Sequence, residues 1–174
     1  LPQEDFCQAT GTPAALKYES EGGPGIRQCL SLLSGSSDAR RDKANFVCVQ
    51  LAFWLLAATD GHAKNYSIFL RRGGGYEMTP LYDVLSMWPI IGNGPDLVSP
   101  HKARLALALR GKSAHYKLQS IQTRHWRALA SQSGVADAFD AMRMLVGNTP
   151  AALQRTEQEL PPDFPEQLWH AVKD

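Results

Sequence analysis

The residues best suited to chemistry lie in one stretch of the chain, ATDGHAKNYSIFLRRGGGYEMTPLYDVLS, residues 58–86. Asp60, Asn65 and Asp83 supply carboxylate and amide oxygens, which are ligands that Mg²⁺ accepts in proteins. A carboxylate can also take the proton of a hydroxyl group or orient that group for attack. Whether the three side chains act together depends on whether the fold brings them to one place.

Two strand-like segments, residues 66–71 and 76–81, are separated by three glycines and predict a β-hairpin. In an antiparallel hairpin the start of the first strand lies beside the end of the second, at a spacing of about 5 Å. Asn65 and Asp83 flank these two ends, so their side chains are predicted to converge as Mg²⁺ ligands. Asp60 lies in the loop that leads to the same point, and its predicted role is to accept a proton from a hydroxyl nucleophile.

Each of these residues taken alone has a plainer interpretation. Asp60 followed by glycine is typical of a turn, and Asn65 and Asp83 can each cap a chain segment. His62 alone indicates a surface or core histidine, and Lys64 alone a solvated charge. The joint arrangement of a long apolar helix, this motif and a short hairpin favours a functional site.

Most of the remaining chain is predicted to be helical. Residues 1–36 are rich in turn formers and are expected to form turns, apart from one short helix near residues 4–9. We expect a long helix over 37–58, a loop over 84–100, and helices over 101–110, 115–132, 135–147, 150–159 and 164–173. GGPG at 22–25 lacks the pattern of a phosphate-binding loop and predicts a turn or the start of a helix. The predicted fold is therefore mainly α with a small β-hairpin, in a single domain over residues 1–174.

The composition is that of one globular domain. The chain has 174 residues, of which 44% are apolar and 20% charged, with a net charge of +1. Its three cysteines lack CxxC spacing, which argues against a disulfide framework or a zinc site. The longest apolar run, residues 47–58, is too short to cross a bilayer. We expect a cytoplasmic protein with no membrane partner, and, because the chain opens on Leu1, a piece of a longer protein.

Five motifs of the chain resemble the carboxy-terminal lobe of HipA, the serine/threonine kinase toxin family of bacterial toxin–antitoxin modules. They are QEDFCQ (3–8), KYESEGGPGI (17–26), ATDGHAKNYSIF (58–69), TPLYDVLS (79–86) and LPPDFPEQ (160–167). DGHAKN and PLYD are the most diagnostic. The spacing is similar to that of kinase catalytic lobes in general, in which an aspartate is followed five residues later by a metal-binding asparagine and, after a hairpin, by a second aspartate. The HRD and DFG signatures themselves are absent.

The resemblance implies a protein-kinase-like C-terminal lobe that uses ATP and Mg²⁺. It makes Asp60 the catalytic aspartate and Asn65 and Asp83 the metal ligands. The lobe's share of the ATP site would comprise His62, Ala63, Lys64, Asn65, Tyr82 and Asp83. Lys64 is also a candidate for stabilising the charge of the transferred group.

The resemblance also implies partners and a missing part. The family pairs with a HipB-type DNA-binding antitoxin and phosphorylates a protein, glutamyl-tRNA synthetase in the best-known case. Its N-terminal lobe carries a glycine-rich loop and an ATP-binding lysine, and neither is evident in this chain. We therefore expect residues 1–174 alone to bind Mg-ATP weakly and to turn over negligibly.

A second feature is a basic block. Between Asp96 and Asp137 the chain has no acidic residue, while it carries Lys102, Arg104, Arg110, Lys112, Lys117, Arg124 and Arg127. Such a block can bind nucleic-acid phosphates in a salt-sensitive way, including operator DNA through the antitoxin complex. The alternative is a solvated helix face, and the sequence leaves both open.

Several function classes therefore remain. A phosphotransferase lobe acting on protein is favoured, and a small-molecule or lipid kinase lobe is its near neighbour. A metal-dependent phosphohydrolase would need a denser set of carboxylates or histidines than Asp60, His62, Asn65 and Asp83 provide. A non-catalytic nucleic-acid-binding or antitoxin-binding module would use the basic block as its binding surface.

Overall fold

The structure is a computed structural model that describes residues 1–174. Its α-helices are α1 (Phe6–Ala9), α2 (Ile26–Leu33), α3 (Ala39–Leu55), α4 (Thr123–Gln132), α5 (Ala138–Glu159) and α6 (Glu166–Lys173). Its strands are β1 (Gln3–Asp5), β2 (Ser67–Leu70), β3 (Tyr76–Met78), β4 (Arg104–Arg110) and β5 (Ala114–Lys117). Short 3₁₀ turns are η1 (Ala14–Leu16), η2 (Glu19–Glu21), η3 (Ala63–Asn65), η4 (Trp88–Ile90) and η5 (Leu118–Ser120).

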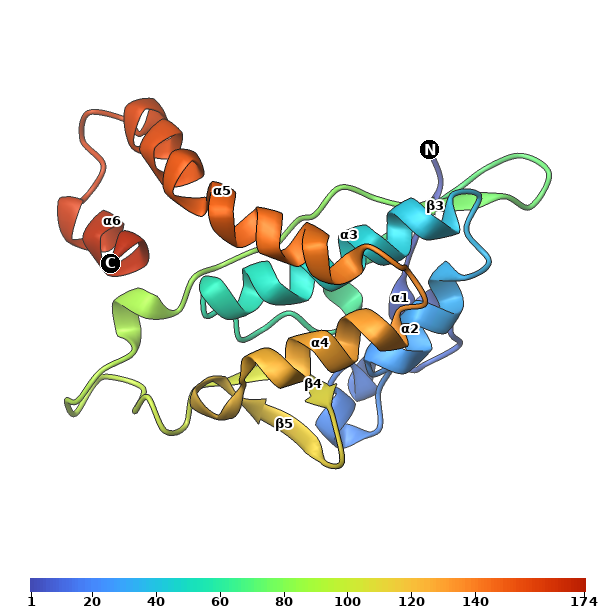
Figure 1. Cartoon of the computed structure of the whole chain (residues 1–174), viewed down its shortest axis with the longest axis horizontal. Helices are drawn as coiled ribbons and strands as arrows, with labels where there is room; N and C mark the ends of the chain where they lie inside the picture. Colours follow the sequence, from blue (N-terminus) through green and yellow to red (C-terminus); the bar gives the residue numbers. More distant parts are fainter.

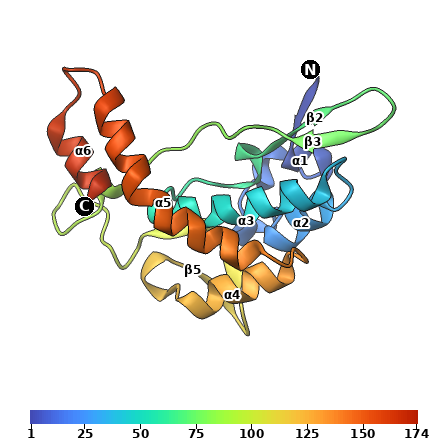
Figure 2. The ribbon, with the colours of Figure 1, turned by 45° about the horizontal axis from the view of Figure 1, so that its top comes forward.

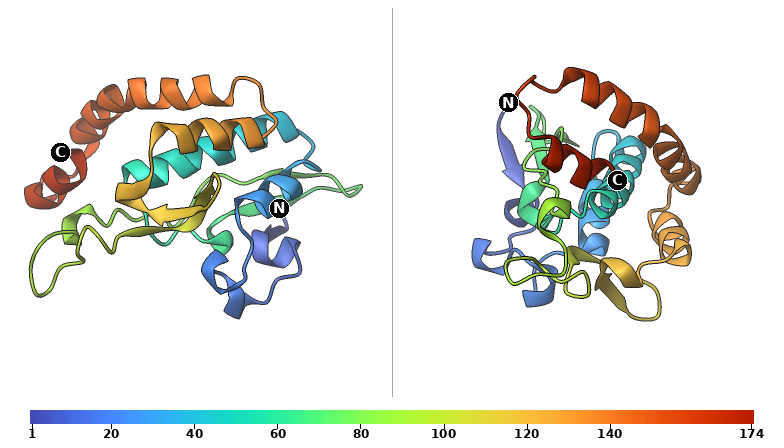
Figure 3. Two further views of the ribbon diagram at one scale, coloured as in Figure 1. Left: turned by 60° about the horizontal axis from the view of Figure 1, so that its bottom comes forward. Right: turned by 90° about the vertical axis from the view of Figure 1, so that its left-hand side faces the viewer.

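Helix α3 runs through the centre of the fold and is packed against α2, α4, α5 and β3 (Figure 1). Helices α5 and α4 cover one side of it, and the β4–β5 ribbon and the N-terminal segment lie on the other (Figure 3). Its apolar side chains, Phe46, Val47 and Leu51 among them, are buried in the core. The buried amide of Gln50 donates to the hydroxyl of Tyr66 at 2.9 Å. The long helix predicted from the sequence is thus confirmed. It leads directly into the loop that carries Asp60.

The predicted β-hairpin is also confirmed, although it belongs to a larger sheet. Strands β2 and β3 pair with Ile68 opposite Met78. Strand β1 adds to the other edge of β2, with Glu4 opposite Ile68, so the order is β1-β2-β3. The N-terminal residues, expected to form only turns and a short helix, therefore hold the first strand of the hairpin in place (Figure 2).

The prediction of a helix over 101–110 was wrong, and the helix predicted over 115–132 is confirmed only from Thr123 onwards. Strands β4 and β5 form a separate antiparallel ribbon, and only residues 123–132 of the second segment are helical. All five residues from Leu105 to Leu109 are buried. A short apolar run that is buried on both faces has no period of two, so its sequence cannot be told from a buried helix. The fold is mainly α with two small sheets rather than one hairpin.

Helix α5 is continuous where a break was expected at Pro150. Proline lacks the N–H that would bond the Val146 carbonyl, yet the helix continues through Pro150 to Glu159. Helix α6 folds back on α5, where the Trp169 indole donates to Glu157 at 2.7 Å. The length and hydropathy needed to cross a bilayer are found in none of the helices.

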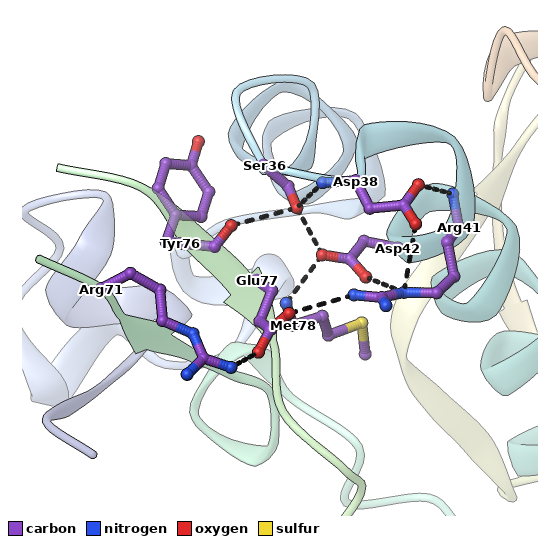
Figure 4. A network of polar contacts seen from close by, with 8 residues as sticks. All are labelled: Ser36, Asp38, Arg41, Asp42, Arg71, Tyr76, Glu77 and Met78. Carbon is purple, nitrogen blue, oxygen red and sulfur yellow. Dashed lines mark hydrogen bonds and ion pairs between the residues drawn. The ribbon is translucent and has the colours of Figure 1, made fainter. Parts of the chain in front are cut away.

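A buried carboxylate fastens the hairpin to α3 (Figure 4). Asp42, in the first turn of α3, is 1% exposed. It accepts hydrogen bonds from the Met78 N–H at 2.7 Å, the Ser36 hydroxyl at 2.5 Å and the Arg41 Nε at 3.2 Å. Arg41 also contacts Glu77 of β3 at 3.3 Å. These charge-assisted bonds fix the second strand of the hairpin, which leads to Asp83.

Candidate functional site

Asn65 and Asp83 meet at the mouth of the β2–β3 hairpin, as predicted. The Asn65 Nδ2 donates to the Asp83 Oδ2 at 2.7 Å, although the residues are 18 positions apart. Asn65 ends the turn η3 and is 2% exposed. Asp83 has a φ of 56°, a left-handed conformation that is uncommon for residues other than glycine. Such backbone geometry persists where surrounding contacts enforce it, and it is frequent at functional sites.

The Asn65 Oδ1 is buried and has no hydrogen-bond partner. Buried polar atoms are nearly always paired, so an unpaired one at this point calls for an explanation. If the amide turned over, Oδ1 would face the Asp83 carboxylate, and two acceptor oxygens side by side need a cation between them. Mg²⁺ typically takes one or two protein oxygens and completes its shell with water and phosphate. The Asn65 and Asp83 side chains therefore fit a hard divalent cation.

Asp60 lies in the loop after α3 and its side chain is 68% exposed. The helix ends through Ala57, which has a φ of 47°, and the Ala58 N–H donates to the Phe53 carbonyl at 2.7 Å. This is the left-handed termination common at helix C-termini. The Asp60 Oδ1 accepts a hydrogen bond from the Tyr18 hydroxyl at 2.6 Å, which leaves Oδ2 for another partner.

His62 lies beside Asp60, with its Nε2 3.9 Å from the Asp60 Oδ2. It is 5% exposed and its ring is edge-on to Tyr18, with centroids 5.1 Å apart. Burial, followed by the charge of Lys17, lowers the pKa of His62, while the carboxylates of Asp60 and Asp83 act in the opposite direction. The His62 N–H donates to the Asp60 carbonyl at 2.8 Å and the Asn65 N–H donates to the His62 carbonyl at 2.9 Å, so the loop from Asp60 to Asn65 is compact. The imidazole is neutral at pH 7.

The other residues assigned to the ATP site hold the loop together. Ala63 is fully buried. The Lys64 ammonium forms an ion pair with Asp5 at 2.6 Å, so its charge is already engaged. The Tyr82 hydroxyl donates to the Lys64 carbonyl at 2.7 Å and lies 2.6 Å from the Ser67 hydroxyl. These contacts fix the backbone of the segments that carry Asn65 and Asp83.

Gly61 is required by the packing of this loop. A Cβ at position 61 would lie 2.2 Å from the Phe53 ring. We expect Gly61→Ala to lower the free energy of unfolding by about 1–3 kcal/mol, measured by chemical denaturation. Gly147→Ala is the matched control, since no atom lies within 4 Å of its Cβ, and it should leave stability unchanged or slightly higher. Equal stability of the two variants would contradict this account.

Sequence reasoning missed Tyr18, which contacts Asp60 across 42 positions. Tyr18 belongs to a segment that was expected to form turns, and no periodic pattern links it to the hairpin. The only sequence signal was the motif KYESEGGPGI. The same motif contains GGPG at 22–25, predicted to form a turn or the start of a helix, and α2 begins at Ile26, directly after GGPG.

The basic block lies on the β4–β5 ribbon, its flanking turns and α4. All seven residues are exposed: Lys102, Arg104, Arg110, Lys112, Lys117, Arg124 and Arg127. Arg110 is bound by Glu19 at 2.5 Å, and the Arg127 guanidinium lies over the Phe139 ring at 4.5 Å. The other five form no ion pair. Their charges are available to a partner.

Two cavities are formed beside α3. One, of about 650 Å³, runs between α3 and β3 past Asn45 and Met78. The other, of about 540 Å³, lies between α3, α4 and α5 beside Trp54 and Trp126. Neither is lined by Asp60, Asn65 or Asp83. The structure has no group of three or more His, Cys, Asp or Glu side chains placed to hold a metal ion.

The chain is similar to several known proteins. The family model described as the HipA-like C-terminal domain matches residues 1–156. A Sinorhizobium fredii protein (strain NBRC 101917 / NGR234) named "Putative kinase Y4mE" is 34% identical over 162 residues, which are 91% of this chain and 36% of that protein. A chain in the solved complex of the Shewanella oneidensis MR-1 toxin–antitoxin system HipA, HipB and its operator DNA matches with a TM-score of 0.80 and 22% identity. That match covers 98% of this chain and 42% of the other, so the chain spans less than half the length of either protein.

Proposed function

The chain belongs to the HipA family as a HipA-like C-terminal domain, and from this premise we propose that it is the catalytic lobe of an ATP-dependent serine/threonine protein kinase. It transfers the γ-phosphate of ATP to a protein hydroxyl. The observation that carries the proposal is the 2.7 Å contact between Asn65 and Asp83, with the unpaired Asn65 Oδ1 beside it. A small-molecule kinase would use the same groups, but the family favours a protein acceptor.

Each residue of the site has one role in this proposal. Asp60 orients the acceptor hydroxyl and takes its proton on Oδ2, the oxygen that Tyr18 leaves free. Asn65 and Asp83 would hold Mg²⁺, which when bound would supply positive charge at the phosphate oxygens. The neutral His62 and the half-exposed ring of Tyr82 form this lobe's share of the nucleotide site. Catalysis then rests on positioning and electrostatic stabilisation.

We further propose that nucleotide is bound between this lobe and a second one. Residues 1–174 contain no glycine-rich phosphate-covering loop and no lysine in a V-A-I-K context. Asp60 is 68% exposed, so the site is open on the side where a second lobe would close it. The chain also covers only 36% of the S. fredii protein. On this proposal residues 1–174 alone transfer phosphate negligibly.

Partners of this protein can be inferred from its membership of the same family. The S. oneidensis complex contains HipA, HipB and operator DNA, and we propose a HipB-like antitoxin and operator DNA as partners of this protein in the cytoplasm. Lys102, Lys112 and Lys117 are exposed and unpaired, which suits salt-sensitive phosphate contacts. Arg110 must first leave Glu19 to join them. For the acceptor protein, glutamyl-tRNA synthetase is the first candidate to test.

Asp60→Asn tests the proposal, because it keeps the shape of the side chain and removes its negative charge. In the full-length protein with its nucleotide-binding lobe, we expect transfer of radiolabelled γ-phosphate to fall by about 10²-fold or more. Asp140→Asn, on the exposed face of α5, is the control and should transfer at the normal rate. Near-normal transfer by Asp60→Asn would remove Asp60 from its role, and robust transfer by residues 1–174 alone would refute the two-lobed site.

A further inference from the structure

Tyr18 touches the proposed catalytic carboxylate from outside the hairpin motif. Its hydroxyl donates to the Asp60 Oδ1 at 2.6 Å, which is short for a hydrogen bond between side chains. Its ring packs edge-on against His62. Asp60 is otherwise largely exposed, and the His62 Nε2 lies 3.9 Å from its Oδ2, beyond hydrogen-bond distance. The phenol is therefore the one strong contact that restricts the Asp60 carboxylate.

The segment that carries Tyr18 is rigidly attached to the core. The neighbouring Glu19 side chain, 5% exposed, accepts from the Ala108 N–H of β4 at 2.7 Å and from Arg110 at 2.5 Å. The Gly23 N–H donates to the Tyr18 carbonyl at 2.9 Å, and a Cβ at position 23 would lie 2.9 Å from that same oxygen. These contacts hold the backbone of Tyr18 in one place, so the position of its hydroxyl is set by the fold.

The Tyr18 phenol stays protonated, and is therefore a hydrogen-bond donor, around neutral pH. The hydrogen bond to Asp60, with partial burial, raises the pKa of Tyr18 to about 12. At neutral pH Tyr18 is therefore protonated and can only donate to Oδ1. The two oxygens of Asp60 are thus distinguished, because Oδ1 accepts the Tyr18 hydrogen bond and Oδ2 has no side-chain hydrogen bond.

We propose that Tyr18 is a positioning residue of the transfer site, holding the Asp60 carboxylate so that Oδ2 faces the acceptor hydroxyl. This inference rests on the proposed function. In the step, the acceptor oxygen forms a bond to the γ-phosphorus of ATP and the bond from that phosphorus to the bridging oxygen breaks. ADP leaves with the electron pair, and the hydroxyl proton passes to the Asp60 Oδ2. Without Tyr18 an exposed carboxylate samples several rotamers, and only part of the population is productive.

Tyr18→Phe in the full-length protein removes the hydroxyl and keeps the ring against His62. We expect kcat to fall by about 10- to 100-fold, because misplacement of a reacting group is costly. The KM for ATP should be unchanged, because Asn65 and Asp83 are not touched. Tyr76→Phe is the matched control: its hydroxyl donates to the Leu32 carbonyl at 2.5 Å, away from the site, and its loss should leave kcat as it is.

A second measurement separates this inference from the proposed function. By NMR, the hydrogen-bonded phenolic proton of Tyr18 should give a downfield-shifted resonance that is lost in both Tyr18→Phe and Asp60→Ala. If Tyr18→Phe has a normal kcat, or alters only the KM for ATP, the positioning role is refuted while the kinase proposal stands. If Asp60→Asn transfers normally, the kinase proposal fails. Absence of the resonance from the wild-type protein refutes the positioning role whatever the activity.

Discussion

Asp83→Ala is expected to abolish phosphoryl transfer, with a loss of at least about 10³-fold. Asp83 is the carboxylate at the hairpin mouth, and the neutral amide of Asn65 alone offers Mg²⁺ no charge compensation. The affinity for ATP should also lose its dependence on Mg²⁺. Isothermal titration with ATP, with and without Mg²⁺, measures this effect separately from the transfer rate.

Two further variants sharpen this prediction. Asp83→Asn keeps a residue type that tolerates the φ of 56°, so it should lose activity and Mg²⁺ dependence without the backbone strain that alanine adds. Asp96→Ala makes the same change in an exposed part of the same connecting segment and should behave as the wild type. Retention of Mg²⁺-dependent ATP binding by Asp83→Asn would show that the cation lies elsewhere.

The candidate site was largely predictable because its geometry is local. Three glycines between two strand-like segments determine a hairpin, and a hairpin necessarily brings Asn65 close to Asp83. The buried helix before it was equally clear from the apolar run at 47–58. These features depend on neighbours in the sequence, and the structure confirms them.

The parts that escaped prediction depend on distant partners. RLALALR at 104–110 consists of good helix formers, and it becomes a strand because α2, α4 and η2 cover it and β5 pairs with it. Tyr18 reaches Asp60 from a turn that no periodicity relates to the hairpin. The role of Asp42 was hidden because an acidic residue in the first turn of a helix is ordinary on electrostatic grounds alone.

Asp42→Ala is expected to cause the largest loss of stability of any single substitution considered for this protein. Removing the carboxylate deprives the Met78 N–H, the Ser36 hydroxyl and Arg41 of their acceptor. Breaking a buried charged network by removing one member typically costs about 3–5 kcal/mol. Chemical denaturation should show a loss of this size, and the amide hydrogen of Met78 should exchange faster.

Glu77→Gln is the matched control, because Glu77 contacts the same Arg41 but is partly exposed. Exposed ion pairs contribute at most about 1 kcal/mol, so this variant should be nearly as stable as the wild type. Asp42 also accepts a hydrogen bond from Met78, the last residue of β3, in the strand that leads to Asp83. At temperatures where Asp42→Ala is still folded, its Mg²⁺-dependent ATP binding should therefore be weaker than that of Glu77→Gln. A loss below about 1 kcal/mol in Asp42→Ala would contradict the conclusion that this carboxylate fastens the hairpin to α3.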